Sequence, residues 1–187
     1  MSIRPVLYLP DPVLRKKARK VTRFNNQLET LITDMIDTMR MSNGVGLAAN
    51  QVGIEQKVCV IEVPIAIEES SSETEDATPT DLYVLVNPQI VTKKGLREVE
   101  EGCLSIPGYR GKVNRSVEVR VRAQDSTGKE FKIKAVDNLL AQALEHEIDH
   151  LNGILYIDHL VSHESLWKIN DPNHADTEHL SLFEYRA

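Results

Sequence analysis

The sequence predicts an α+β fold in which antiparallel β-strands pack around one central helix, with further helices towards the N-terminus. Residues 27–42 place apolar side chains at helical spacing, and residues 137–152 form a second, leucine-rich helical stretch. Between them, the valines of residues 116–124 alternate with other residues, and a turn sequence follows at 126–129. These patterns indicate strands joined as hairpins between two main helices.

The remaining elements follow in chain order. A short helix is expected near residues 11–19, ahead of the long helix. The predicted strands lie near residues 57–63, 82–90, 97–102, 116–124 and 129–136. The second helix has Asp137 as its expected N-cap and Gly153 as its stop, and a strand near 154–158 completes the core.

Length and composition indicate a compact protein. The 187 residues are 41% hydrophobic, so residues 1–187 are expected to form a single domain with a substantial core. The net charge of −6 argues against a nucleic-acid-binding surface. Of the two cysteines, Cys59 lies in an apolar strand, so no disulfide framework is expected and a reducing compartment fits. No signal-peptide core or membrane-length apolar run is present, which predicts a cytoplasmic protein without membrane contact.

Three segments stand apart from these elements. Residues 66–81 are acidic and rich in Ser and Thr, which predicts a mobile loop insertion, either a passive linker or a docking site for a partner. Residues 161–187 are polar, of mixed charge and interrupted by a proline, which predicts an irregular C-terminal tail. The triplet 114–116 matches a glycosylation site only nominally, because nothing directs the chain outside the cell.

The pentapeptide 146–150 is the strongest functional signal. His146 and His150 are four residues apart, so on a helix both imidazoles emerge from one face and can reach one metal ion. Glu147 points to the neighbouring side, where it can act on a water without being a ligand. Leucines precede the motif, and burying two histidines and a glutamate is costly unless a metal satisfies them. The central helix is therefore predicted to be a metal-binding helix.

A catalytic metal needs a third ligand. Tyr156 stands where the longer metzincin motif has its third histidine, which excludes that motif. Glu164 and Glu178 are eligible acids, but both lie in the polar tail. Cys103 follows a glycine in the segment 100–108, and its thiolate would complete a Cys-His-His site, although it could also be a hydrolase nucleophile with a histidine as base.

The segment 44–51 has two interpretations. Residues 44–49 match the dinucleotide-binding pattern G-x-G-x-x-A, which requires a strand before it and a helix after it. A helix precedes it here, which argues against NAD binding. A glycine-rich loop that ends in Gln51 instead suits a wall for an extended peptide, with the glutamine amide as a hydrogen-bond donor.

Taken together, the segments 44–51, 101–105 and 146–150 resemble the three signature motifs of the peptide deformylase family (bacterial type), in the family's order. The likeness covers roughly residues 5–160. It implies a metal-dependent hydrolase that removes the formyl group from the N-terminal formylmethionine of nascent polypeptides and releases formate. Its partners would be N-formylmethionyl peptides and, transiently, chains still on the ribosome, without direct nucleic-acid binding, since the tail lacks the long basic helix of many bacterial members.

The resemblance also implies residue roles. Cys103, His146 and His150 would hold the metal, and Glu147 would take the proton of the attacking water and return it to the leaving amine. The Gln51 side chain and the Leu104 backbone N–H would donate to the developing oxyanion. The remaining candidates bind substrate: Gly46 through its backbone, Arg110 beyond the methionine, and Val45, Val99, Leu139 and Ala143 in the methionine pocket.

The family's metal is Fe²⁺, but a Cys-His-His set also suits Zn²⁺, Ni²⁺ or Co²⁺. Asp149 is expected to be structural, and Glu101 either contacts a ligand or is a solvated charge. Gln142 lies near the expected methionine pocket and leaves its specificity open. Two rival hypotheses are a zinc peptidase that cleaves internal amides and a metal-holding module without turnover; Cys103 argues against the first, and Glu147 and Gln51 argue against the second.

Overall fold

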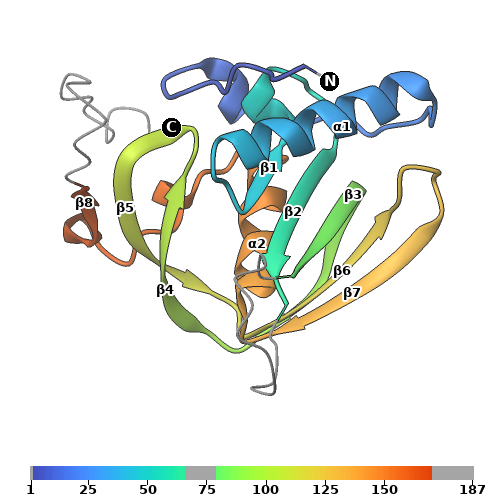
Figure 1. The fold of residues 1–187 in the computed structure, drawn as a ribbon. Coiled ribbons are helices and arrows are strands. Elements are labelled where there is room, and N and C mark those ends of the chain that lie inside the picture. The colour runs from blue at the N-terminus through green and yellow to red at the C-terminus, as the bar shows by residue number, and fades with distance from the viewer. Residues whose placement is uncertain (1, 66–78, 170–187) are drawn as a thin grey trace, which may run out of the picture.

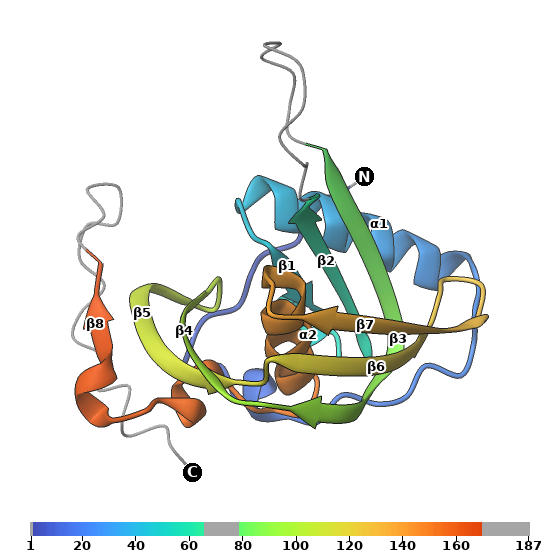
Figure 2. The ribbon, with the colours of Figure 1, turned by 90° about the horizontal axis from the view of Figure 1, so that it is seen from below.

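The computed structural model describes residues 2–65 and 79–169 and has two antiparallel sheets on either side of a central helix (Figure 1). The larger sheet has the order β1-β2-β3-β6-β7, and the smaller sheet has the order β4-β5-β8. Helix α2 (Leu139–His150) lies between the sheets, and α1 (Asn26–Met41) lies against β1 and β2 (Figures 1 and 2). The predicted α+β class, with antiparallel strands around a central helix, is confirmed.

The bounds of the strands agree with most of the sequence-based expectations. The larger sheet consists of β1 (Gly46–Ala48), β2 (Val58–Pro64), β3 (Thr80–Lys94), β6 (Glu118–Gln124) and β7 (Glu130–Val136). The smaller sheet consists of β4 (Arg97–Cys103), β5 (Ile106–Arg115) and β8 (Leu166–Lys168). Strands β1, β5 and β8 are not among the predicted strands. In β5, charged residues and glycines interrupt the alternation of apolar residues that would predict a strand. Its buried side chains include that of an arginine, Arg115, as well as that of Val113.

Helix α1 forms where the periodicity predicts it. The Asn25 side chain accepts a hydrogen bond from the backbone N–H of Leu28 at 3.2 Å, which caps the first turn. The helix packs its buried face against β1 and β2. That face consists mainly of Leu28, Leu31, Ile32, Met35 and Met39.

Two predicted elements are wrong. The helix expected at 11–19 is a single 3-10 turn, Pro12–Arg15, because the backbone from Lys16 onwards is extended and bonds elsewhere: the N–H of Ala18 donates to the carbonyl of Leu151 at 2.9 Å. The strand expected at 154–158 contains the start of another 3-10 turn, Tyr156–His159, which the Asp158 carboxylate stabilises by accepting from the N–H of Leu155 at 2.8 Å.

Helix α2 begins one residue later than predicted. Asn138, not Asp137, is its N-cap and accepts from the N–H of Ala141 at 2.9 Å. Asp137 has a φ of 48° and pairs with Arg97 at 3.0 Å instead. Gly153 is the predicted stop, with a φ of 76°. A Cβ there would overlap the Arg15 carbonyl, so the turn that ends the helix also permits close packing of the N-terminal segment.

The insertion and the tail are only partly within the described residues. The N–H of Ile65 donates to the carbonyl of Pro79 at 2.9 Å, so the ends of the predicted 66–81 loop lie side by side where β2 pairs with β3. Residues 80 and 81 belong to β3, and 66–78 lie outside the described residues. In the predicted irregular tail, β8 pairs with β5, and residues 170–187 lie outside the described part of the chain (Figure 2).

Candidate metal centre

One sulfur atom and two imidazole nitrogens meet between the two sheets. Cys103 stands at the end of β4, while His146 and His150 project from one face of α2. The Cys103 Sγ lies 3.2 Å from the His150 Nε2, which lies 3.2 Å from the His146 Nε2. One ligand atom from each residue fits within 4.8 Å of the other two. Thiolate and imidazole are ligands of divalent transition metals, so this cluster could hold one ion.

A hydrogen bond on the side of the ring away from the cluster fixes the orientation of His146. Its Nδ1 lies 2.8 Å from the Glu101 Oε2, which leaves the Nε2 facing the cluster. Glu101 is buried, and Arg115 donates to the same carboxylate from Nε at 2.7 Å and from Nη2 at 2.9 Å. Burial alone would raise the pKa of Glu101, but the hydrogen bonds from His146 and Arg115 outweigh it and lower the pKa to about 2. The geometry therefore supports the interpretation that Glu101 contacts a candidate ligand, His146, and not the interpretation that it is a solvated charge.

Asp149 belongs to the same buried network. Its carboxylate accepts from the Arg115 Nη1 and lies 3.0 Å from the His159 Nε2. Its position away from the cluster agrees with the expected structural role. Arg115 is 1% exposed and joins both carboxylates, yet in the sequence it stands out only as part of a nominal glycosylation triplet. Local sequence carries no signal for it, because both of its partners come from other elements.

Glu147 lies on the cleft side of α2, and its side chain is buried. Its Oε2 has no hydrogen-bond partner among the described residues. Burial raises the pKa of this carboxyl to about 7. The backbone of Gly46 passes so close that a Cβ at that position would overlap the carboxylate. A buried carboxyl with a free oxygen and a pKa near neutrality is suited to accept and return a proton.

Gln51 is held beside the candidate sulfur ligand. The 3-10 turn Ala49–Val52 carries it, and its Oε1 accepts from the N–H of Ala48 at 2.8 Å. The Nε2 therefore points the other way and lies 3.1 Å from the Ser105 Oγ and 3.5 Å from the Cys103 Sγ. The amide is thus fixed with its donor group towards the cluster.

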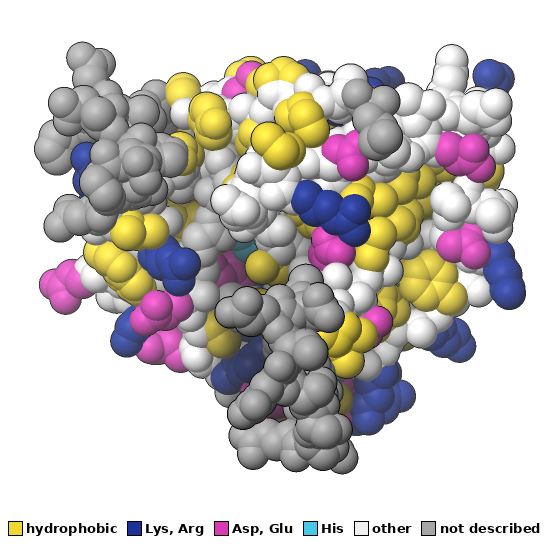
Figure 3. All heavy atoms as spheres, viewed as in Figure 1, with side chains coloured by type: hydrophobic (Ala, Val, Ile, Leu, Met, Phe, Trp, Pro, Cys, Tyr) yellow, Lys and Arg dark blue, Asp and Glu magenta, His cyan; other side chains and the backbone are white. Residues whose placement is uncertain are grey.

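The cluster opens into a cleft of about 390 Å³, and Figure 3 shows this face hollowed, with histidine atoms at the bottom of the hollow. Most of the predicted substrate-binding residues line this cleft: Val45, Gly46, Arg110, Leu139 and Ala143. Leu104, the predicted oxyanion donor, lines it as well. Val99 does not line it; its side chain packs against the core around Tyr156. Gln142 also lines the cleft and donates to the Glu100 carbonyl at 2.9 Å, and Ile169, which the sequence analysis did not name, forms part of the wall.

The remaining candidates of the sequence analysis are not part of the cluster. Cys59 is fully buried in β2, and burial raises the pKa of its thiol, as expected of a core residue. Glu164 lies in the 3-10 turn His163–Ser165 and is absent from the ligand group formed by the described residues, while Glu178 lies outside them. The segment 44–49 follows a helix and leads into a 3-10 turn, so the strand and helix of a dinucleotide-binding motif are missing there.

Within the described residues, no helix is long and apolar enough to span a membrane.

Comparisons with known proteins agree with this geometry. The family model for polypeptide deformylase matches residues 3–165. The peptide deformylase of Dehalococcoides mccartyi strain CBDB1 is 46% identical over 178 residues, which cover 95% of this chain and 98% of the relative. That of Heliobacterium modesticaldum is 48% identical over 158 residues, which cover 84% and 94%. The crystal structure of a peptide deformylase from Legionella pneumophila superposes with a TM-score of 0.74 at 44% identity, over 88% of this chain and 89% of that one.

The matched region spans all three motifs, the ligand cluster and the buried network behind it. A likeness of this extent and identity leaves no room for a chance match of the short histidine motif, and it decides against the internal peptidase and the inactive metal module. The chain belongs to the peptide deformylase family, metal-dependent hydrolases that remove the N-terminal formyl group from peptides.

Proposed function

We propose that this chain deformylates N-formylmethionyl peptides with a divalent metal held by Cys103, His146 and His150. The single observation that carries the proposal is the convergence of these three ligand atoms with the buried Glu147 carboxyl in one cleft. The buried polar groups support the fit, because the Nε2 atoms of His146 and His150 face each other at 3.2 Å and His146 is already oriented by Glu101. The Glu147 Oε2, which would act beside the metal, has no partner among the described residues.

Fe²⁺ is the metal we propose for the cell. One soft sulfur and two imidazoles also accept Zn²⁺, Ni²⁺ or Co²⁺, so the ligand set favours a transition metal over Mg²⁺ or Ca²⁺. When bound, such an ion lowers the pKa of water and polarises the formyl carbonyl.

Glu147 is the proposed general base and acid. It accepts a proton from the water whose oxygen attacks the formyl carbon, and it then donates that proton to the amine nitrogen as the carbon–nitrogen bond breaks. Formate and a free amino terminus leave. The pKa near 7 supports the role, because a group that must both take and give a proton works best close to the ambient pH.

Gln51 and Leu104 are the proposed oxyanion donors. The Gln51 Oε1 is already occupied by the N–H of Ala48, so only its Nε2 can turn to the substrate oxygen. The Leu104 backbone N–H, directly after Cys103, would donate from the other side. Donors that are fixed before the reaction stabilise the developing charge without reorganisation.

The cleft walls support the proposed substrate. The half-exposed Val45 and Leu139 and the buried Ala143 offer apolar surface for a methionine side chain. Gly46 leaves its backbone open to an extended peptide, and the exposed Arg110 is placed to meet the residues beyond. The formyl carbon carries only hydrogen, so a tight site can exclude acetyl groups by size.

The cellular setting completes the proposal. We assign the activity to the cytoplasm, with ribosome-borne nascent chains as transient partners and no direct nucleic-acid or membrane binding. Two free cysteines, one of them a candidate ligand, support a reducing compartment. Residues 1–187 are proposed to act as a single catalytic domain, with the 66–81 insertion outside its chemistry.

The test is formate release by protein purified without oxygen. A formyl-Met tripeptide should be hydrolysed, while its acetyl-Met counterpart and an internally cleavable blocked peptide should remain intact. Cys103→Ala should lose the metal and the activity, whereas Glu147→Gln should lose the activity and keep stoichiometric metal. Full metal content and normal turnover in Cys103→Ala would place the third ligand elsewhere, and internal cleavage would restore the peptidase hypothesis.

A further inference from the structure

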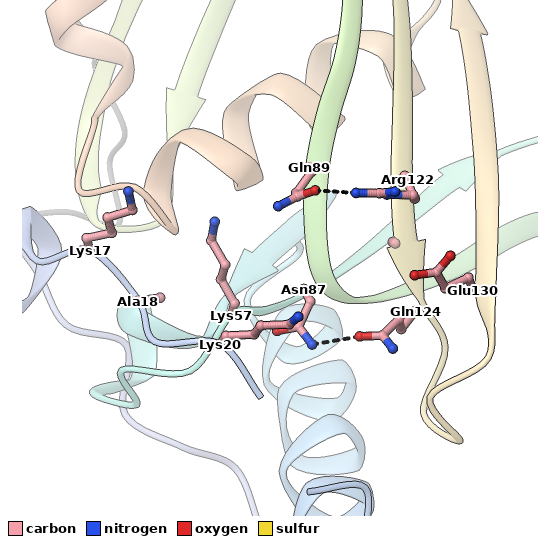
Figure 4. Close-up of a pocket in the computed structure, with 10 residues that line it drawn as sticks. Lys17, Ala18, Lys20, Lys57, Asn87, Gln89, Arg122, Gln124 and Glu130 are labelled. Carbon is pink, nitrogen blue, oxygen red and sulfur yellow. Dashed lines mark hydrogen bonds between the residues drawn. The ribbon is translucent and has the colours of Figure 1, made fainter. Parts of the chain in front are cut away.

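A second cleft, of about 300 Å³, shares no lining residue with the metal cleft (Figure 4). The N-terminal segment after the first 3-10 turn forms one side, and strands β3 and β6 form the other. The charged or amide side chains that matter for its chemistry are Lys17, Lys20, Lys57, Gln89, Arg122 and Glu130.

The cleft concentrates positive charge on a protein of net charge −6. Four cationic side chains and one carboxylate line it. No ion pair joins Lys17, Lys20 or Lys57 to a carboxylate within residues 2–65 and 79–169. By contrast, Lys16 and Arg19, which directly precede Lys17 and Lys20 in the sequence, both pair with Glu55 at 3.0 and 3.3 Å. The cleft thus brings together three lysines without an ion pair, while the cations next to two of them in the sequence are paired.

The backbone around the lysines is held in place before any ligand arrives. The N–H of Ala18 donates to the Leu151 carbonyl at 2.9 Å, and the N–H of Lys57 donates to the Arg19 carbonyl at 2.8 Å. The N–H of Asn87 donates to the Lys57 carbonyl at 2.7 Å. Binding therefore needs no ordering of the main chain, which lowers its entropic cost.

A bulge in β3 brings an amide to the same space. The register of β3 with β6 shifts between Val86 and Gln89, and Asn87 adopts a φ of 54°. The Gln89 Oε1 accepts from the Arg122 Nη2 at 2.9 Å, so its NH₂ group points into the cleft, towards Lys57 (Figure 4). The bulge thus adds a neutral donor to the lysine ammonium groups.

The ammonium groups of Lys17 and Lys57 disfavour each other. Partial burial lowers the pKa of Lys57, and the charge of Lys17 lowers it further. An anion between them would replace this repulsion with two attractions, since charge-assisted hydrogen bonds are the strong ones.

We propose that this cleft binds a compact phosphate-bearing molecule, of the size of a nucleoside monophosphate or a sugar phosphate, through Lys17, Lys57 and Gln89. The volume of about 300 Å³ exceeds the need of a free inorganic phosphate and falls at the lower end of small-molecule sites. A nucleic-acid strand fits less well, because most of the cations beside the cleft are already paired with carboxylates. Lys16 and Arg19 pair with Glu55, and Arg120 and Lys134, which continue from the cleft along β6 and β7, pair with Glu118.

The test is calorimetric titration of the metal-loaded enzyme with AMP, ribose 5-phosphate, inorganic phosphate and adenosine at constant ionic strength. At least one of the two organic phosphates should bind saturably with a submillimolar Kd, inorganic phosphate should compete with it, and adenosine should not bind. Lys57→Ala should weaken binding by roughly ten- to hundredfold, the usual range for one charge-assisted hydrogen bond.

Two variants complete the design. Lys17→Ala removes an exposed cleft lysine with little risk to folding, and it should weaken binding in the same direction. Lys94→Ala removes an exposed lysine from the far end of β3 and should change nothing. Deformylase activity should be normal in all three variants, because none of these residues lines the metal cleft.

The proposal is overturned if no probe binds saturably, if adenosine binds as well as AMP, or if Lys57→Ala and Lys17→Ala bind like the wild type. Binding of inorganic phosphate alone would mean an adventitious ion only. A single-stranded RNA decamer that binds at least tenfold more tightly than AMP and depends on Lys57 would replace the small molecule with a nucleic acid.

Discussion

Replacing Glu147 with glutamine should stabilise the metal-free protein at neutral and alkaline pH while abolishing its activity. Glu147 is buried, and its Oε2 has no partner among the described residues. Burial raises the pKa of the carboxyl from 4.5 to about 7. The folded state therefore holds a proton on Glu147 that the unfolded state has already released between pH 4.5 and about 7.

The sign and size of the effect follow from this difference. Where the folded state binds more protons, its stability falls as the pH rises. The step from 4.5 to about 7, at about 1.36 kcal/mol for each pH unit, gives roughly 3 kcal/mol of destabilisation. This destabilisation is absent below pH 4.5 and complete above pH 8. Glutamine has nearly the same shape as glutamate and does not ionise, so the variant is not destabilised at high pH in this way.

Urea denaturation of both metal-free proteins between pH 4.5 and 9 measures the difference directly. The two free energies of unfolding should agree at the acid end and diverge to roughly 3 kcal/mol at pH 8, with the variant the more stable. Groups such as Glu101 titrate in both proteins and largely cancel in the comparison. A difference that stays constant across this range would refute the argument, because it would mean that the buried carboxyl does not carry the ionisation cost.

Three further outcomes are expected. Arg115→Met should lower the free energy of unfolding by about 3–5 kcal/mol in urea denaturation, because it leaves two buried carboxylates without their shared cation; a loss below 1 kcal/mol would contradict this. Gly46→Ala should reduce kcat with the metal content unchanged, because its Cβ would displace the Glu147 carboxylate, and unaltered kinetics would disprove that contact. Gln51→Ala should reduce kcat by about 10²–10³ with the metal retained, whereas an unchanged kcat would remove Gln51 from the oxyanion role.

The parts of the fold that were predictable are those with a local cause. Helix α1 has a repeating apolar face and an asparagine cap, and β6 alternates cleanly, so short-range periodicity was sufficient for both. The helix predicted at 11–19 is absent for the opposite reason. Backbone groups of this segment bond to Leu151 and Glu55, which are distant in sequence, and these bonds replace those of a helix. Strand β5 was missed because two of its positions serve packing that no periodicity reveals: a glycine at 111 under Leu160 and a buried arginine at 115.

The candidate site likewise has residues that local sequence predicts and residues that only the tertiary structure brings together. The spacing of His146 and His150 follows from helix geometry alone, so the sequence was enough to place them on one face. Their assembly with Cys103 depends on the approach of β4 to α2, and here the motif resemblance supplied what local patterns could not. Glu101 and Arg115 show the limit, because a buried ion pair looks like two ordinary surface charges until the elements that carry them are brought together.

The glycine pattern of residues 44–49 shows how one local signal fits two chemistries. In a dinucleotide-binding loop, such glycines let the backbone approach a phosphate. Here a Cβ at Gly46 would overlap the Glu147 carboxylate, and a Cβ at Gly44 would lie 2.8 Å from the Leu104 side chain. In both folds the physical requirement is the same: a backbone without side chains that passes close to another group, a phosphate in one case and the side chains of Glu147 and Leu104 in the other. The pattern therefore predicts the close approach correctly, while the element before the glycines, here a helix, distinguishes this loop from a dinucleotide-binding one.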